Sequence, residues 1–191
     1  MQATLIPKGP LFKELNKKID GAMGLHLTFA ERCVLDEATY IGPHPSINAV
    51  AGHFQNFTPM YLTIEVKRPN QDKDPLIQLG AWASAEFEKR ELEGYSLDMP
   101  TLAIEIDGDT WRLWVVEAIT DREGAYQSCH FIGPVRMGGT DEVMDVFRIL
   151  HFLCLCADWG LEEYRKWVDK QILGRYTKEN ERKKLLNRSV T

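Results

Sequence analysis

The feature that most constrains this chain is an apolar run, residues 61–68, that carries a glutamate and a lysine two positions apart. Strand side chains alternate between the two faces of a sheet, so Glu65 and Lys67 would lie on one face and Ile64 and Val66 on the other. A carboxylate beside an ammonium group at the end of a buried strand is costly unless it is paired or used. With an acidic residue on a preceding strand, the pair would form a divalent-metal site whose lysine lies close enough to polarise water.

The length and composition are those of one globular domain. At 191 residues the chain suits a single domain over 1–191 with a full core, in which residues 175–191 form a polar tail that frays. The hydrophobic content of 44% and the charged content of 27% are ordinary for a soluble protein. No apolar run approaches the roughly 20 residues of a membrane helix, and the N-terminus lacks the basic and apolar regions of a secretion signal.

Charge and cysteine content narrow the class of protein further. The net charge of -5 argues against a protein that coats nucleic acid by charge alone, although a local basic cleft is compatible with it. The cysteines show neither zinc-binding spacing nor a CxxC pair; they are Cys33, Cys129, Cys154 and Cys156. Buried, reduced thiols predict an intracellular location, either cytoplasmic or nuclear.

Hydrophobic periodicity and turn residues predict a mixed order of helices and strands. Helices are predicted over residues 11–19, 76–92, 143–159 and 161–173, with Thr140 or Asp141 as the N-cap of the third. Strands are predicted over residues 25–29, 33–41, 61–67, 101–106, 111–119 and 126–135. Turns or loops are predicted over 42–46, 69–75 and 107–110, and the segment 47–57 is ambiguous. This order predicts an α/β sandwich in which helices flank a central mixed β-sheet.

A series of short motifs in a fixed order carries a resemblance to a known family. The motifs are Val34-Leu35-Asp36, Ser46-Ile47-Asn48, Thr63-Ile64-Glu65-Val66-Lys67, Gln78-Leu79-Gly80-Ala81-Trp82-Ala83, Met99-Pro100-Thr101-Leu102-Ala103-Ile104, Gly108-Asp109-Thr110-Trp111, Met137-Gly138-Gly139-Thr140 and Tyr164-Arg165-Lys166-Trp167. Together they resemble the fungal PD-(D/E)XK nuclease-like domain family, within the restriction-endonuclease-like superfamily. The resemblance implies a restriction-endonuclease-like core with extra C-terminal helices. The chain departs from the family pattern at Ala49 and Asp109, where the family has histidines.

The resemblance also implies a metal-dependent nuclease site that acts on nucleic acid. Asp36 and Glu65 would bind Mg²⁺ or Mn²⁺ together with the carbonyl group of Val66 and water. Lys67 would orient or deprotonate the attacking water and stabilise the transition state. Gln78, in the following helix, would hold the water or a phosphate oxygen.

Some assignments within this site stay open. Glu37 and Glu31 are alternatives to Asp36 as the acid of the first strand, and Glu14 is a candidate outer acid. A surface acid at the end of a strand explains Asp36 about as well as a metal ligand does. A basic rim around the site would consist of Lys67, Arg68, Lys73, Lys89 and Arg90.

Two other interpretations account for the same residues. Glu65 and Lys67 would form a plain ion pair if their strand lay at an exposed edge of the sheet. The fold can also be repurposed, because a fold does not determine its chemistry. In that case the cleft would bind a small apolar molecule without metal, either for acid–base chemistry such as a cyclisation or isomerisation, or as a catalytically silent binding module. This interpretation predicts an apolar pocket near Glu65.

Overall fold

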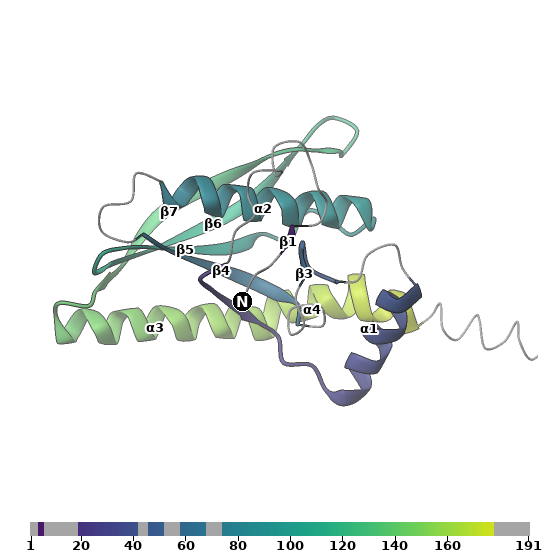
Figure 1. Cartoon of the computed structure of the whole chain (residues 1–191), viewed down its shortest axis with the longest axis horizontal. Coiled ribbons are helices and arrows are strands. Elements are labelled where there is room, and N and C mark those ends of the chain that lie inside the picture. Colours follow the sequence, from purple (N-terminus) through teal and green to yellow (C-terminus); the bar gives the residue numbers. More distant parts are fainter. Residues whose placement is uncertain (1–3, 6–18, 42–45, 52–57, 68–73, 178–191) are drawn as a thin grey trace, which may run out of the picture.

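The computed structural model describes residues 4–5, 19–41, 46–51, 58–67 and 74–177. In chain order the elements are β1 (Thr4–Leu5), β2 (Gly21–Gly24), α1 (Phe29–Ile41), β3 (Val50–Ala51), β4 (Met60–Lys67), α2 (Pro75–Leu92), β5 (Thr101–Asp107), β6 (Thr110–Thr120), β7 (Tyr126–Gly139), α3 (Val143–Trp159), η3 (Gly160–Tyr164), α4 (Arg165–Val168) and η4 (Asp169–Leu173). Helix α2 covers one face of the main sheet and the C-terminal helical segment covers the other (Figure 1). The predicted α/β sandwich, with helices on both faces of a central sheet, is therefore confirmed.

The main sheet has five strands in the order β2-β4-β5-β6-β7. Strands β4 and β5 are parallel, and every other neighbouring pair is antiparallel. Helix α2 forms the long crossover that a parallel pair requires. The strands predicted over 61–67, 101–106 and 111–119 are confirmed, and β7 extends four residues beyond its predicted end at 135, to Gly139. The short strands β1 and β3 form a separate antiparallel pair.

Alternation along the strands separates two apolar layers. On one face, Ala103 of β5 and Val116 of β6 pack against Leu79, Ala83 and Phe87 of α2, and all five side chains are buried. These helix positions are spaced by four residues, which places them on one side of α2. The helix predicted over 76–92 is thus confirmed, and its apolar stripe positions it over the centre of the sheet.

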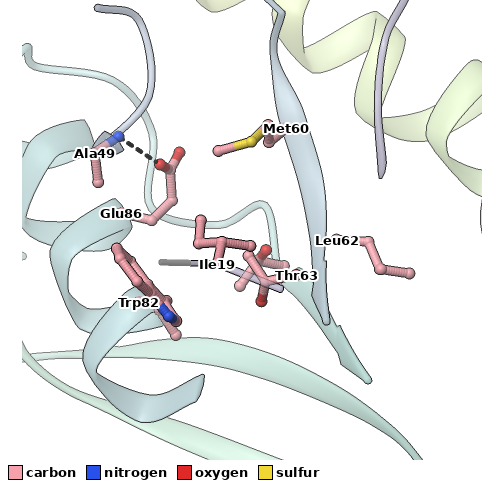
Figure 2. A pocket seen from close by; sticks show the side chains of 9 residues that line it. Ile19, Ala49, Met60, Leu62, Thr63, Trp82 and Glu86 are labelled. Atoms are coloured by element: carbon pink, nitrogen blue, oxygen red, sulfur yellow. Dashed lines mark hydrogen bonds between the residues drawn. The ribbon is translucent and has the colours of Figure 1, made fainter. Parts of the chain in front are cut away.

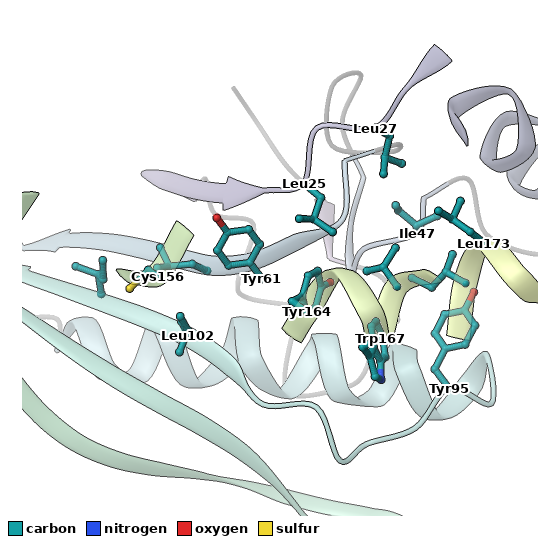
Figure 3. Packing of buried hydrophobic residues seen from close by; sticks show 14 of the residues in the cluster. Leu25, Leu27, Ile47, Tyr61, Tyr95, Leu102, Cys156, Tyr164, Trp167 and Leu173 are labelled. Carbon is teal, nitrogen blue, oxygen red and sulfur yellow. The ribbon is translucent and has the colours of Figure 1, made fainter. Parts of the chain in front are cut away.

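The other face of the sheet packs against the C-terminal helical segment (Figure 3). Tyr61 of β4 contacts Tyr164, with ring centroids 5.6 Å apart, and Tyr164 stacks on Trp167 at 5.5 Å. Gly160 allows this close approach, because a Cβ atom there would lie 2.4 Å from the Tyr61 ring. Any larger residue at position 160 would separate the helix from β4.

The C-terminal segment is one continuous helix rather than two. The helix predicted over 143–159 matches α3, but the helix predicted over 161–173 is not separate from it. Gly160 keeps helical dihedral angles (φ -61°, ψ -42°), and the π-helical turns η3 and η4 continue the chain without a break. The predicted N-cap was also wrong: α3 begins after Glu142, which makes no side-chain capping bond.

The strands predicted over 25–29 and 33–41 were wrong, because residues 25–28 form neither strand nor helix and residues 29–41 form α1. The start of this helix is a capping box. The backbone N–H of Thr28 donates to Glu31 Oε2 at 2.7 Å, and the backbone N–H of Glu31 donates to Thr28 Oγ1 at 3.4 Å. This reciprocal cap satisfies two otherwise unpaired N–H groups, which favours a helix over the strand suggested by alternation.

Acid should selectively weaken the α1 cap. Burial opposes ionisation of Glu31, but hydrogen bonds from Thr28 and Arg165 outweigh it, so the pKa of Glu31 lies below its ordinary value. The carboxylate therefore stabilises the fold fully above the ordinary glutamate pKa of about 4.3, and this stabilisation is lost as the pH falls through the lower pKa of the folded state. We expect Glu31→Ala to cost about 1 kcal/mol at neutral pH.

Urea unfolding from pH 7 down to acid measures this difference. The gap between wild type and Glu31→Ala should close as the pH falls. Glu123→Ala, in the exposed turn between β6 and β7, is the control and should have little effect at any pH. A gap that stays constant in acid would contradict the assigned role of Glu31.

Several predicted features lie outside the described residues. These are most of the helix predicted over 11–19 with the candidate acid Glu14, the turn at 42–45, the loop at 69–73 with Arg68 and Lys73 of the proposed rim, and the tail from 178. Within the described part of the chain, no helix is long and apolar enough to span a membrane.

Candidate active site

Glu65 is a buried carboxylate in the interior of the sheet. Its side chain is 3% exposed, and Oε1 accepts a hydrogen bond from the indole N–H of Trp82 at 2.9 Å. Strand β4 lies between β2 and β5, so it is not an edge strand. Lys67 is one-third exposed and forms an ion pair with Asp107 of β5, Nζ to Oδ1 3.9 Å. The interpretation of Glu65 and Lys67 as an ion pair on an exposed edge was therefore wrong.

Strand β5 places a second pair of acids beside the first pair. Glu105 lies in register with Glu65, and Asp107 lies in register with Lys67. Partners on parallel strands share a face, so these four side chains emerge together on the α2 side of the sheet. Sequence analysis did not consider Glu105 and treated 107–110 only as a turn, although the E-x-D spacing on a buried strand mirrors the E-x-K spacing on β4.

Glu105 is held by two donors from β6. It is 7% exposed and accepts hydrogen bonds from Arg112 Nη1 at 3.1 Å and from the indole N–H of Trp114 at 3.2 Å. Arg112 also approaches Asp107 Oδ2 at 3.8 Å. An indole N–H thus donates to each of the two buried carboxylates on this face. Arg112 supplies a one-third exposed cation that sequence analysis missed.

A further acid, Asp20, lies at the same end of β4. It directly precedes β2, whose first residue Gly21 pairs with Ile64. Asp20 therefore lies next to the end of β4 that carries Glu65. Asp20 Oδ2 accepts a hydrogen bond from the backbone N–H of Val66 at 3.0 Å. The structure therefore brings Asp20 to the site, and sequence analysis missed it because a four-residue strand with two glycines shows no strand pattern.

The acids predicted for the first strand lie elsewhere. Asp36 is an exposed residue of α1, which packs against η4. Figure 1 shows α1 at the opposite end of the sheet from the carboxyl end of β4. Glu31 bonds to Thr28 and to Arg165, and the side chain of Glu37 lies outside the described residues. The structure thus brings neither Asp36 nor Glu31 to Glu65, because the segment that carries them is a helix.

Gln78 lies on the face of α2 that is turned toward the site. It precedes Trp82 by four residues, which puts both side chains on the same side of the helix. Asp74 fixes the beginning of α2: its Oδ1 accepts from the N–H of Leu76 at 2.9 Å, and Pro75 occupies the first helical position. Gln78 is half-buried in this first turn.

The predicted basic rim is not supported at Lys89 and Arg90. Both side chains are buried, at 2% and 1% exposure, and each pairs with a glutamate four residues away. Lys89 Nζ lies 3.1 Å from Glu93 Oε1, and Arg90 Nε lies 3.1 Å from Glu86 Oε1. These cations stabilise the helix and its packing instead of facing a ligand.

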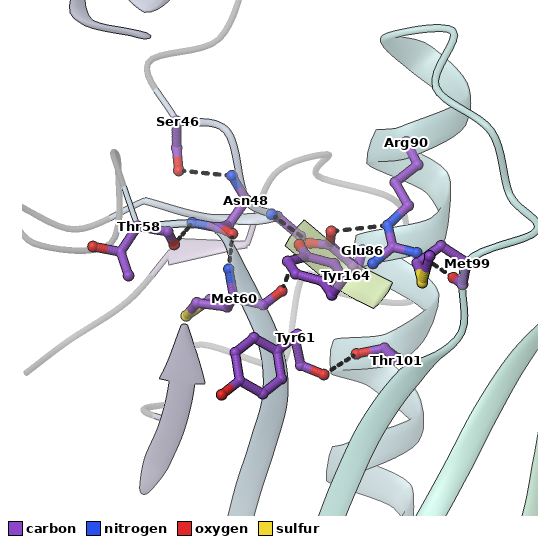
Figure 4. Close-up of polar contacts among 11 residues, drawn as sticks. Ser46, Asn48, Thr58, Met60, Tyr61, Glu86, Arg90, Met99, Thr101 and Tyr164 are labelled. Carbon is purple, nitrogen blue, oxygen red and sulfur yellow. Dashed lines mark hydrogen bonds and ion pairs between the residues drawn. The ribbon is translucent and has the colours of Figure 1, made fainter. Parts of the chain in front are cut away.

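The segment 46–51 fixes the beginning of β4 (Figure 4). Asn48 is 1% exposed; its Oδ1 accepts from the N–H of Met60 and its Nδ2 donates to the carbonyl group of Thr58, both at 2.9 Å. The N–H of Ala49 donates to Glu86 Oε2 at 3.2 Å, which links this segment to α2. The Ser46-Ile47-Asn48 motif therefore has a structural role at the end of β4 opposite Glu65.

A small cavity lies beside Trp82 (Figure 2). Its volume is ≈ 20 Å³, and Trp82, Met60, Leu62 and Ile19 are among the residues that line it. A cavity of this size accommodates about one water molecule. This cavity is therefore too small for the apolar ligand that the repurposed-fold interpretation requires.

The oxygen atoms at the carboxyl end of β4 suit a hard divalent cation. Mg²⁺ prefers carboxylate and carbonyl oxygens with water. The N–H and C=O groups of a strand residue point to the same side of the strand. The carbonyl of Val66 therefore points to the side of β4 on which the Val66 N–H bonds to Asp20. Within the described residues, no three His, Cys, Asp or Glu side chains group closely enough to form a metal site. Asp20, Glu65 and the Val66 carbonyl would therefore need water to complete a coordination shell.

Comparison with known proteins agrees with this geometry. Residues 1–165 match the model of a family described as PD-(D/E)XK nuclease superfamily. The match covers β2, β4, α2 and β5, which position the site, together with the rest of the sheet. No curated protein and no solved structure matches the chain. Members of this superfamily typically use divalent metals and act on nucleic acid, so the match supports a nuclease-like function in general. The chain belongs to the PD-(D/E)XK nuclease superfamily.

Proposed function

We propose that this chain hydrolyses phosphodiester bonds in nucleic acid, with Mg²⁺ or Mn²⁺, at the carboxyl ends of β4 and β5. The observation that carries the proposal is the hydrogen bond from the Val66 N–H to Asp20 Oδ2 at 3.0 Å. This bond fixes a second carboxylate beside the strand end that carries Glu65 and Lys67. Two acids and a lysine at one strand end are the groups that metal-assisted hydrolysis of a phosphodiester requires.

Asp20, Glu65 and the carbonyl of Val66 would hold the metal. We assign the first acid to Asp20 rather than to Asp36, Glu37 or Glu31, because Asp20 precedes the Gly21–Ile64 pair and bonds to the N–H of Val66, next to Glu65. When bound, the metal lowers the pKa of water and neutralises charge on the phosphate. The indole N–H of Trp82 donates to Glu65, so this carboxylate is already oriented.

The remaining side chains of the site bind and orient the substrate and the water. Lys67 directs its ammonium group toward the developing negative charge and orients or deprotonates the attacking water. Gln78, in the first turn of α2, holds the water by accepting a hydrogen bond from it, or donates a hydrogen bond to a phosphate oxygen. Arg112, held by Glu105 at 3.1 Å, contributes the second cation for the nucleic acid backbone.

Calorimetric titration with Mg²⁺ and Mn²⁺ tests the assignment of the acids. Wild type should bind one metal ion saturably, and Asp20→Asn and Glu65→Ala should each weaken binding at least about tenfold. Asp36→Asn is the matched control, since the same change on exposed α1 should leave the affinity unchanged. Loss of binding in Asp36→Asn but not in Asp20→Asn would overturn our assignment. The absence of binding in wild type would overturn the proposed metal-dependent function.

A further inference from the structure

The outer face of α3 is apolar where a surface helix is normally polar. Val143 is 73% exposed, Met144 68%, Phe147 61% and Leu150 55%, and Leu161 of η3 is 64% exposed. Half of the large hydrophobic side chains that are exposed among the described residues lie on this one helix; besides these five they include Val146 and Leu155. An exposed apolar patch of this extent on a soluble domain marks a surface for association.

The spacing along this face is that of a helix–helix seam. The residues at its centre are Val143, Phe147, Leu150, Cys154, Ala157 and Leu161, with steps of four, three, four, three and four. This alternation is the heptad pattern by which two helices pack along their length. The buried residues Asp145, Ile149 and Cys156 lie on the opposite side of α3. The same helix thus has one side for the sheet and one for a second helix; we call the outer side the α3 seam.

We propose that the α3 seam is the interface of a two-fold homodimer. A heptad seam is complementary to another copy of itself, and a two-fold axis brings the same patch of both subunits together. A stable interface of standard size buries ~800 Å² on each partner, and the exposed apolar side chains of the α3 seam extend from Val143 to Leu161 of η3. The apolar face therefore runs along the whole of α3, as a helix–helix contact between two copies of this chain requires.

The charges on α3 do not suit a membrane surface or nucleic acid as the occupant. Helices that bind anionic lipid carry lysine and arginine beside their apolar face. Arg148 is the single basic Lys or Arg residue of α3, and it is ion-paired with Asp145 at 2.9 Å, while Asp158 adds a negative charge. A seam without lysine or arginine favours an apolar protein surface.

The dimer leaves both candidate active sites open. Figure 1 shows α3 and α2 on opposite faces of the main sheet. Glu65 of the candidate site bonds to Trp82 of α2, so the site and the α3 seam lie on different sides of the molecule. The interface therefore does not depend on the proposed nuclease function, and its test is separate from the metal titration.

Sedimentation equilibrium of the full chain over a range of concentrations tests the proposal. Wild type should sediment as a dimer. Phe147→Glu and Leu150→Glu should each raise the dissociation constant at least about 30-fold, because a buried unpaired charge replaces a central contact. Leu92→Glu introduces the same charge at a residue that is 62% exposed at the end of α2, and it should leave the dimer intact.

Circular dichroism should show that all three variants keep the helical content of wild type, since each replaced side chain is more than half exposed. A wild type that is monomeric at every concentration overturns the proposal, and so does one that binds anionic vesicles as a monomer. Dimers of unchanged affinity in both α3 variants would overturn it as well.

Discussion

Replacing Lys67 by methionine is expected to lower the rate constant of metal-dependent cleavage by about 10²- to 10⁴-fold. The ammonium group shares a face with Glu65 and Asp107 but is not a metal ligand, so its loss removes stabilisation of the transition state rather than metal binding. The Lys67 side chain is 35% exposed and its ion pair with Asp107 is long, at 3.9 Å, so the fold should tolerate the change. The expected signature is a low kcat at nearly unchanged metal affinity.

Cleavage of labelled single- and double-stranded DNA and RNA, followed alongside calorimetry, measures both quantities. Lys170→Met, at an exposed position of η4, is the matched control and should behave as wild type. If Lys67→Met cleaved at the rate of wild type, Lys67 would have no part in the reaction. If it lost metal binding together with activity, its role would be to maintain the structure of the site.

Replacing Arg90 by methionine is expected to destabilise the fold by about 3–5 kcal/mol. Arg90 is buried, its Nε bonds to Glu86, and its Nη1 donates to the carbonyl of Met99. Its guanidinium group lies between two rings, 5.2 Å from the centroid of Phe87 and 4.7 Å from that of Trp167. Methionine keeps much of the volume but leaves the Glu86 carboxylate without its charged partner, which is the main cost.

Urea unfolding followed by far-ultraviolet circular dichroism gives the free energy of unfolding. The double variant Glu86→Gln with Arg90→Met should be less destabilised than the sum of the two single variants, because no buried charge is left unpaired. Arg122→Met, in the exposed β6–β7 turn, should stay within about 0.5 kcal/mol of wild type. A loss below about 1 kcal/mol in Arg90→Met would show that Arg90 is not important for packing.

The elements that sequence analysis predicted correctly are those with strong local patterns. The strand with Glu65 and Lys67, the helix with Trp82 and the hairpin of β5 and β6 each combine a clear periodicity with turn or cap residues. For residues 33–41 the apolar alternation was misleading. The capping box at Thr28 and Glu31 was visible in the sequence and would have predicted α1 correctly.

The acid of the site was harder to predict than the strand. Asp20 has no local signal, and its position beside Glu65 results from pairing between β2 and β4, segments some 40 residues apart. Non-local pairing of this kind cannot be deduced from periodicity. The burial of Lys89 and Arg90 could have been anticipated, because each has a glutamate four residues away on α2, at positions 93 and 86.

The contact between Gly160 and Tyr61 has a consequence for association. The Tyr61 ring occupies the space that a side chain at position 160 would fill, so the C-terminal helix is prevented from sliding or rotating on the sheet. The outer residues of α3 are consequently held in fixed positions relative to the sheet before a partner binds. A rigid surface loses little conformational entropy when it associates, so more of the free energy gained from apolar contact is retained as affinity.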